Sequence, residues 1–159
     1  MSKTSQDSIK AFNKLYRLPM SDTPALINGS SISTIERLEA FKKTLLDEIS
    51  EVDDIINKLR YREAHDIPMS QEDTVNILAD IADWLGDIQI YCKSELLKFG
   101  LDDELVFSII MSSNMSKLGD DGAPLYDEHG KVLKGPRYWP PEPQLRRYIQ
   151  AAIRTGYVK

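Results

Sequence analysis

Apolar residues recur every three or four positions along a first long segment of the chain. They are Ile35, Leu38, Phe41, Leu45, Ile49, Val52, Ile56 and Leu59. This period is typical of a helix that buries one face. The run Ser33-Thr34-Ile35-Glu36 has the pattern of a capping box, in which the serine hydroxyl accepts a hydrogen bond from a backbone N–H and the glutamate accepts another. We therefore expect the helix to begin there.

A second long helix is predicted from about Glu72 to Phe99, and Gly100 would end it. One side of this helix carries Leu78, Ile81, Leu85, Ile88 and Cys92. An adjoining face carries Ile77, Trp84 and Tyr91. Because a chain of this size cannot bury two apolar faces of a long helix by itself, the pattern predicts a homodimer or homotetramer.

Shorter elements flank the two long helices. An N-terminal amphipathic stretch contains Ile9, Phe12, Leu15 and Tyr16, and a third helix is expected from Asp102 or Asp103 to about Lys117. A hairpin about His129-Gly130 precedes a short helix with Leu145, Tyr148, Ile149 and Ile153. The pattern predicts an all-α helical bundle with a short irregular or hairpin-containing C-terminal tail. We expect one domain, with an N-terminal arm at 1–31, a helical core at 33–118 and a tail at 119–159.

Composition narrows the class of protein. With 159 residues, 42% hydrophobic and 28% charged, the chain is long enough for one domain with a core and too apolar to be disordered. It has no apolar run of about 20 residues and no secretory signal, so we expect a cytoplasmic protein without a membrane partner. The single cysteine, Cys92, and two distant histidines, His65 and His129, exclude a zinc site built from cysteine and histidine.

The net charge of -5 is unevenly distributed. Residues 47–104 carry sixteen Asp and Glu against five Lys and Arg, whereas residues 117–159 carry five against eight. An acidic middle segment repels a phosphate backbone unless cations intervene, so no stable nucleic-acid partner is expected. Divalent cations bound to the acidic residues would allow phosphate groups to bind there.

Two sets of carboxylates are candidates for holding those cations. Glu48 and Glu51 lie one helical turn apart, and Asp80, Asp83 and Asp87 form an acidic stripe along the second helix with no nearby Lys or Arg in the sequence. Both sets could simply be solvated surfaces. Aspartate and glycine are poor choices for the interior of a helix, however, and carboxylates from two helices can converge on Mg²⁺, which prefers oxygen ligands.

A third set of residues has groups suited to phosphate. The run Ser113-Asn114-Met115-Ser116-Lys117 ends the third helix, and Lys131, Lys134 and Arg137 follow it. A lysine near a helix C-terminus also has a purely structural interpretation, because it interacts favourably with the helix dipole. Tyr138 and Trp139, beside prolines, could stack on a base or could pin the tail to the core.

The segment 33–143 resembles the all-α nucleoside triphosphate pyrophosphohydrolases, the MazG-like and phosphoribosyl-ATP pyrophosphohydrolase-like superfamily. The resemblance is carried by Asp47-Glu48-x-x-Glu51, the Asp-rich second helix, the run from Ser113 to Gly119, Asp121-Gly122-x-Pro124-x-Tyr126 and the run from Gly130 to Pro136. Two positions depart from the family pattern: Asp47 stands where glutamate is usual, and the E-x-x-D motif has no exact copy, since Trp84 or Asp80 occupies the glutamate position.

The resemblance implies Mg²⁺-dependent cleavage of a nucleotide between its α- and β-phosphates, with Mn²⁺ as a possible substitute. Metal ligands would come from Glu48, Glu51, Asp80, Asp83 and Asp87, with either Asp80 or Asp87 completing the site beside Asp83. Asn114, Lys117, Lys134 and Arg137 would bind the substrate, and Glu48, Glu51, Asp83 and Lys117 would act in catalysis. The alternative is a non-catalytic helical module that binds nucleotide or a protein partner.

Overall fold

The computed structural model describes residues 4–156, and in this range regular structure is helical throughout. The elements are α1 (Ser5–Leu15), the short 3₁₀ helix η1 (Ile27–Gly29), α2 (Ser31–Ser50), α3 (Val52–Ala64), α4 (Gln71–Lys98), α5 (Asp103–Met115) and α6 (Glu142–Thr155). The predicted all-α fold class is confirmed. The hairpin expected about His129-Gly130 is present as a small loop closed by one antiparallel bridge between Tyr126 and Val132.

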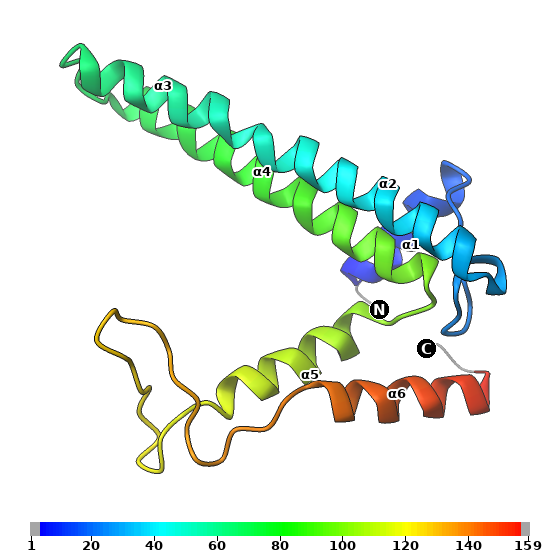
Figure 1. Cartoon of the computed structure of the whole chain (residues 1–159). Coiled ribbons are helices and arrows are strands. Elements are labelled where there is room, and N and C mark those ends of the chain that lie inside the picture. Colours follow the sequence, from blue (N-terminus) through cyan, green and yellow to red (C-terminus); the bar gives the residue numbers. More distant parts are fainter. Residues whose placement is uncertain (1–3, 157–159) are drawn as a thin grey trace.

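The dominant feature is a long helical hairpin in which α2 and α3 run antiparallel to α4 (Figure 1). The predicted first long helix is therefore two helices in succession, separated only at Glu51. Glu51 keeps right-handed helical angles, but its N–H donates to the carbonyl of Glu48 at 3.2 Å, and Asp54 donates to Glu51 at 3.2 Å. These three-residue hydrogen bonds tighten the helix locally. The tightened turn lies at one of the candidate metal ligands.

The predicted capping box at Ser33 is wrong. The cap of helix α2 lies three residues earlier, at Ser30, whose hydroxyl accepts a hydrogen bond from the N–H of Ser33, and the helix begins at Ser31. The turn of η1 places Ser30 in extended backbone immediately before the helix, so this earlier serine takes the capping position.

Helix α4 matches its prediction to within one residue at each end. Ser70 and Asp73 form a reciprocal capping box at its start. At its other end the loop between α1 and η1 packs against the last turn, where Ser21 donates to the carbonyl of Leu97 and Ala25 to that of Phe99. Helix α1 also packs on α4, so the N-terminal arm is fastened to the central helix.

Gly100 allows this junction to form, and its replacement should be costly. Its φ is +67°, and a Cβ at this position would lie 2.2 Å from the carbonyl oxygen of Thr23. We expect Gly100→Ala to lower the free energy of unfolding by about 2 kcal/mol or more, because both the backbone strain and the clash must be relieved.

The matched control is Gly130→Ala, where φ is +78° but nothing lies within 4 Å of the added Cβ. Strain alone should cost this variant about 1 kcal/mol. Thermal unfolding of both variants measures the difference, and equal losses would contradict the role of the Thr23 contact.

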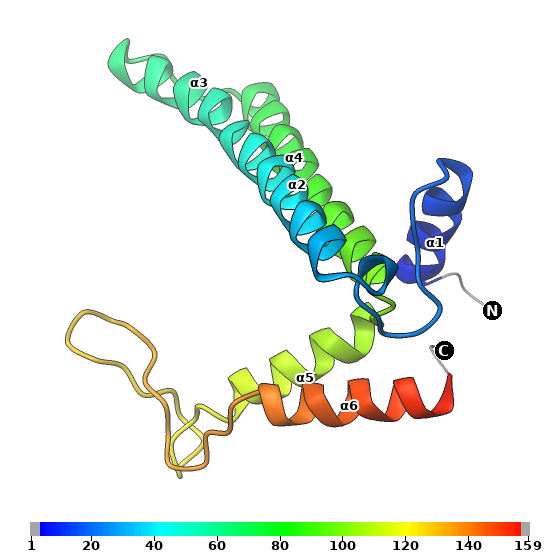
Figure 2. The ribbon, with the colours of Figure 1, turned by 45° about the vertical axis from the view of Figure 1, so that its right-hand side comes forward.

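Helices α5 and α6 form a second pair that diverges from the long hairpin (Figures 1 and 2). Asp102 caps α5 by accepting a hydrogen bond from the N–H of Leu105. The Asp102 N–H donates to the Tyr148 hydroxyl at 2.8 Å, which ties α6 to the start of α5. The loop between the two helices lies apart from α2 and α4 in both views.

Of the two apolar faces of α4, the one that carries Ile77 and Trp84 packs within the chain. Ile77 and Trp84 face α3 and α2, whereas Leu78 is 59% exposed and Leu85 is 45% exposed. Periodicity in the sequence does not distinguish the two faces, because both are apolar. The acidic stripe also lies toward α3 and α2: Asp80 pairs with Lys58, and the charges of Asp83 and Asp87 act on Glu48, although Asp83 itself is exposed to solvent.

None of the helices between residues 4 and 156 has the length and apolar character needed to cross a bilayer.

Candidate functional site

The packing of α2 on α4 brings four of the predicted carboxylates close enough for their charges to affect one another. Glu48 lies near the end of α2 and Glu51 at the α2–α3 junction, while Asp83 and Asp87 lie one turn apart on α4. The indole N–H of Trp84 donates to the backbone carbonyl of Glu48 at 2.9 Å. This bond joins the two helices beside the carboxylates. Trp84 therefore has a structural role beside the carboxylates.

Glu48 is the most unusual of these groups. Only 6% of it is exposed, and its buried Oε1 atom has no hydrogen-bond partner among the residues that the structure describes. Burial raises the pKa of its carboxyl above the usual range, and the negative charges of Glu51, Asp87 and Asp83 raise the pKa further. A buried carboxylate without a partner is unfavourable in the folded chain. A positive charge bound beside Glu48 would therefore stabilise this arrangement.

Tyr91 belongs to the same neighbourhood. Burial raises the pKa of its hydroxyl, as do the charges of Glu48, Asp87 and Glu51. From the sequence, Tyr91 was assigned only to an apolar face. The available signal was its position four residues after Asp87, which places the two side chains on one side of α4.

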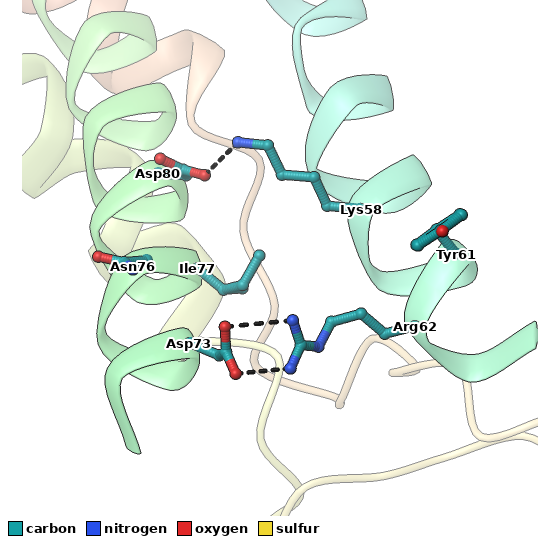
Figure 3. A pocket seen from close by; sticks show the side chains of 7 residues that line it. All are labelled: Lys58, Tyr61, Arg62, Asp73, Asn76, Ile77 and Asp80. Carbon is teal, nitrogen blue, oxygen red and sulfur yellow. Dashed lines mark hydrogen bonds and ion pairs between the residues drawn. The ribbon is translucent and has the colours of Figure 1, made fainter. Parts of the chain in front are cut away.

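Asp80 stands apart from this group. Lys58 of α3 donates to its carboxylate at 2.7 Å, and one turn from the hairpin end Arg62 makes a two-pronged pair with Asp73 (Figure 3). The expectation that no cation neutralises the acidic stripe is therefore wrong for Asp80. Lys58 is 22 positions away in sequence, and only the antiparallel packing of α3 on α4 makes it a neighbour. A cavity of about 450 Å³ lies here, and its acidic and basic side chains are paired with each other.

The four remaining carboxylates do not close into a cage. Within residues 4–156, no three carboxylate, imidazole or thiol groups come together closely enough to hold a metal ion. Mg²⁺ is usually held by one or two protein carboxylates, with waters and substrate phosphates completing its shell. The Glu48 Oε1 atom, which lies near three other carboxylates, fits a metal site of this open kind. Which of these carboxylates bind metal stays a prediction.

The predicted substrate-binding residues gather at the far end of α5. Lys117 donates to the side-chain oxygen of Asn114 at 2.7 Å. The N–H of Gly135 donates to the Lys117 carbonyl at 2.9 Å, which fastens the following loop to this point. Lys117 and Asn114 therefore form one unit at the surface, as their spacing of three residues implies.

Other polar groups of this region have partners inside the loop. The ammonium of Lys134 lies 4.5 Å from the ring centre of Tyr138. Arg137 donates to the carbonyl of Asp120 at 3.2 Å and lies 3.6 Å from its carboxylate. The hydroxyls of Ser113 and Ser116 bond to the backbone of Trp139, so the structure uses them to hold the tail. A role for Lys134 or Arg137 in binding substrate stays a prediction.

The acidic and basic groups are not brought together within one chain. The carboxylates lie midway along the long hairpin, whereas the end of α5 and the loop after it lie apart from α2 and α4 in two views (Figures 1 and 2). Among the described residues, the charges that act on Glu48 are those of Glu51, Asp83 and Asp87. Within residues 4–156 the two predicted sets of site residues therefore lie apart.

Comparison with known proteins finds similarity at the level of structure. No family model and no curated protein matches the sequence. The crystal structure of a proposed NTP pyrophosphohydrolase from Exiguobacterium sp. 255-15 is similar over 98% of this chain and 100% of that one, with a TM-score of 0.51 and 21% identity. The two chains share an all-α fold. At this level of sequence identity, the similarity establishes the fold class and does not establish the activity.

Proposed function

We propose that the chain is a Mg²⁺-dependent nucleotide pyrophosphohydrolase that yields a nucleoside monophosphate and pyrophosphate. The observation that carries the proposal is the buried Glu48 carboxylate, whose Oε1 atom lacks a partner while three further carboxylates act on it. A divalent cation relieves this repulsion and also neutralises the phosphates of a nucleotide. Similarity of fold to a protein described as an NTP pyrophosphohydrolase agrees with this chemistry.

In this proposal Glu48, Glu51, Asp83 and Asp87 would hold Mg²⁺, with Mn²⁺ as a substitute, and the bound ion would polarise the phosphates and acidify water. Asp80 is less suited to the task because Lys58 already neutralises it. A carboxylate of the group that does not contact the ion would accept the proton of the attacking water. Trp84 keeps α2 and α4 in register through its bond to Glu48.

Lys117 and Asn114 would bind the departing pyrophosphate, where negative charge accumulates as the bond between the phosphates breaks. Lys134 and Arg137 lie on the adjoining loop and would assist after exchanging their present partners, Tyr138 and Asp120, for phosphate. These roles follow from the family resemblance and from the pairing of Lys117 with Asn114.

We further propose that the chain functions as a homodimer or homotetramer. Its accessible surface is 11768 Å², whereas a compact monomer of this mass exposes about 8,100 Å². The excess is several times the roughly 800 Å² that each partner buries in a standard interface. Among the described residues, the open apolar positions include Leu78 and Leu85 on α4 and Phe107 and Met115 on α5. A second copy would cover them and would supply the basic loop that the carboxylates lack.

Light scattering coupled to size-exclusion chromatography tests this assembly. We expect a particle of at least twice 18.1 kDa at micromolar concentration. Replacing Leu85 with lysine should shift the particle toward the monomer, because a charge would then be placed in the interface. A monodisperse monomer of the unaltered chain would exclude the assembly.

The activity itself is tested by incubating the purified protein with a panel of nucleoside triphosphates and phosphoribosyl-ATP and measuring pyrophosphate. We expect release with Mg²⁺ or Mn²⁺ and none when EDTA removes the metal. The competing function is a non-catalytic module that binds nucleotide or a protein partner. That module would release no pyrophosphate from any member of the panel under either condition.

Lys117→Ala separates a catalytic lysine from a structural one. Because its ammonium bonds only to Asn114 at the surface, its loss should change the melting temperature by less than about 2 °C. We expect turnover to fall roughly tenfold to a hundredfold, since a charge-assisted phosphate contact is lost. Lys42→Ala, which replaces an exposed lysine of α2 outside the predicted site, is the control. Parallel losses of stability and turnover would mark Lys117 as structural.

A further inference from the structure

A second cavity adjoins the carboxylates, on the side where α1 packs against α4, and residues of α1, α2 and α4 line it. Its volume is about 570 Å³, within the usual range for small-molecule sites. Asp87 and Tyr91 line it, and both belong to the electrostatic field of Glu48. The cavity and the candidate metal site therefore share a wall.

The lining of this cavity is suited to a nucleoside. Phe12 of α1, Phe41 of α2 and Tyr91 of α4 provide aromatic rings, on which bases of any sequence can stack. Arg37 and Ser94 provide polar groups beside these rings. A guanidinium group presents N–H donors in a plane that matches the carbonyl and ring-nitrogen acceptors of a base.

The polar groups are held in place by buried partners. Arg37 donates to Glu95 at 2.8 Å, and Lys98 donates to the same carboxylate at 2.9 Å. The Ser94 hydroxyl donates to the side-chain oxygen of Asn13, which is fully buried. Because this bond uses the hydroxyl proton of Ser94, its oxygen is left as an acceptor. The wall is therefore preorganised.

Spacing along α4 connects the two sites. Asp83, Asp87, Tyr91 and Ser94 follow one another at intervals of three or four residues, so they form one stripe of the helix. From Asp87 to Ser94 the helix rises about 10 Å. A nucleotide whose phosphates lie at Asp83 and Asp87 can extend along this stripe with its sugar and base toward Ser94.

We propose that the cavity between α1, α2 and α4 binds the nucleoside part of the substrate, and that Phe12 and Phe41 set the affinity for the base. This inference rests on the proposed function for its orientation, because the phosphates define the other end of the ligand. It assigns α1 a role in substrate selection that the family resemblance, which begins at residue 33, does not include.

Calorimetric binding to the full chain in the presence of Mg²⁺ tests the cavity without requiring turnover. The probes are adenosine, guanosine, cytidine, uridine and thymidine, with tripolyphosphate as a ligand that has phosphates and no base. We expect at least one nucleoside to bind, and Phe12→Ala and Phe41→Ala each to weaken it tenfold or more. Tripolyphosphate should bind these variants within twofold of the unaltered chain. Tyr61→Ala is the matched control, an exposed aromatic at the far end of α3.

Failure of this inference is distinguishable from failure of the proposed function. If nucleotides are hydrolysed but both phenylalanine variants keep the same KM and the same nucleoside affinity, the cavity does not hold the base. If no nucleoside binds the unaltered chain at millimolar concentration, the inference is also overturned. If nucleosides bind in a Phe41-dependent way and no nucleotide releases pyrophosphate, the cavity is supported and the catalytic proposal fails. Phe12 is 44% exposed, so its replacement should leave the fold intact.

Discussion

Glu48→Gln should abolish Mg²⁺-dependent hydrolysis and, in the same molecule, raise the melting temperature of the metal-free protein. Its carboxylate is buried and one oxygen has no partner, and burial with three neighbouring carboxylates raises its pKa. Since a raised carboxyl pKa means that the ionised form is disfavoured in the folded chain, an uncharged amide of the same shape removes that unfavourable charge. Each kcal/mol relieved corresponds to about 2–4 °C for a chain of this length. Activity should fall a hundredfold or more, because the amide is a poor ligand for a hard cation.

Thermal unfolding with and without Mg²⁺ measures both parts of this prediction. Mg²⁺ should raise the melting temperature of the unaltered protein, since a ligand that binds only the folded state stabilises it, and should raise that of Glu48→Gln much less. Glu39→Gln, an exposed position on the same helix, is the control and should change neither quantity. A Glu48→Gln protein that is destabilised and keeps its activity would mean that Glu48 has a structural role only.

Asp83→Asn should also abolish Mg²⁺-dependent activity, and Asp87→Asn should cost more activity than Asp80→Asn. Asp83 lies within one turn of both other aspartates, so either arrangement of ligands includes it. Asp80 and Asp87 are about 10 Å apart along the helix axis, too far for both to bind one Mg²⁺ at about 2.1 Å. The ion pair of Asp80 with Lys58, and the charges of Asp83 and Asp87 on Glu48, favour Asp87.

Steady-state rates as a function of Mg²⁺ concentration distinguish these variants. Asp80→Asn serves as the matched control because it loses the exposed bridge to Lys58, which should cost about 1 kcal/mol or less. Full activity and unchanged Mg²⁺ dependence in Asp83→Asn would make the stripe a surface without a metal role. A larger loss of activity in Asp80→Asn than in Asp87→Asn would reverse the proposed set of ligands.

The helices were predictable because local chemistry determines them. Ser70 and Gly100 mark the ends of α4, and the three-to-four-residue period marks α2 and α3. Orientation about the helix axis was not predictable, because α4 is apolar on two sides. Periodicity cannot tell which side packs within the chain, and the structure places Trp84 inward and leaves Leu85 half exposed.

The candidate site was predictable in its acidic residues and not in its surroundings. Helical spacing pairs Glu48 with Glu51 and Asp83 with Asp87. Lys58 and Asp80 are 22 residues apart in sequence. They pair only because α3 packs on α4, and no local sequence pattern reveals that packing. The cavity beside Tyr91 likewise needs α1, whose sequence shows amphipathicity but not the surface on which it packs.

The most direct test of the central claim is ³¹P NMR of the products formed from the nucleotide that the panel identifies as the best substrate, with Glu48→Gln protein assayed in parallel. If the carboxylates of α2 and α4 support pyrophosphohydrolysis, the unaltered protein with Mg²⁺ will give resonances of nucleoside monophosphate and pyrophosphate in equal amounts, and the variant will give neither. Orthophosphate with nucleoside diphosphate, or identical product formation by the Glu48→Gln protein, would contradict the account.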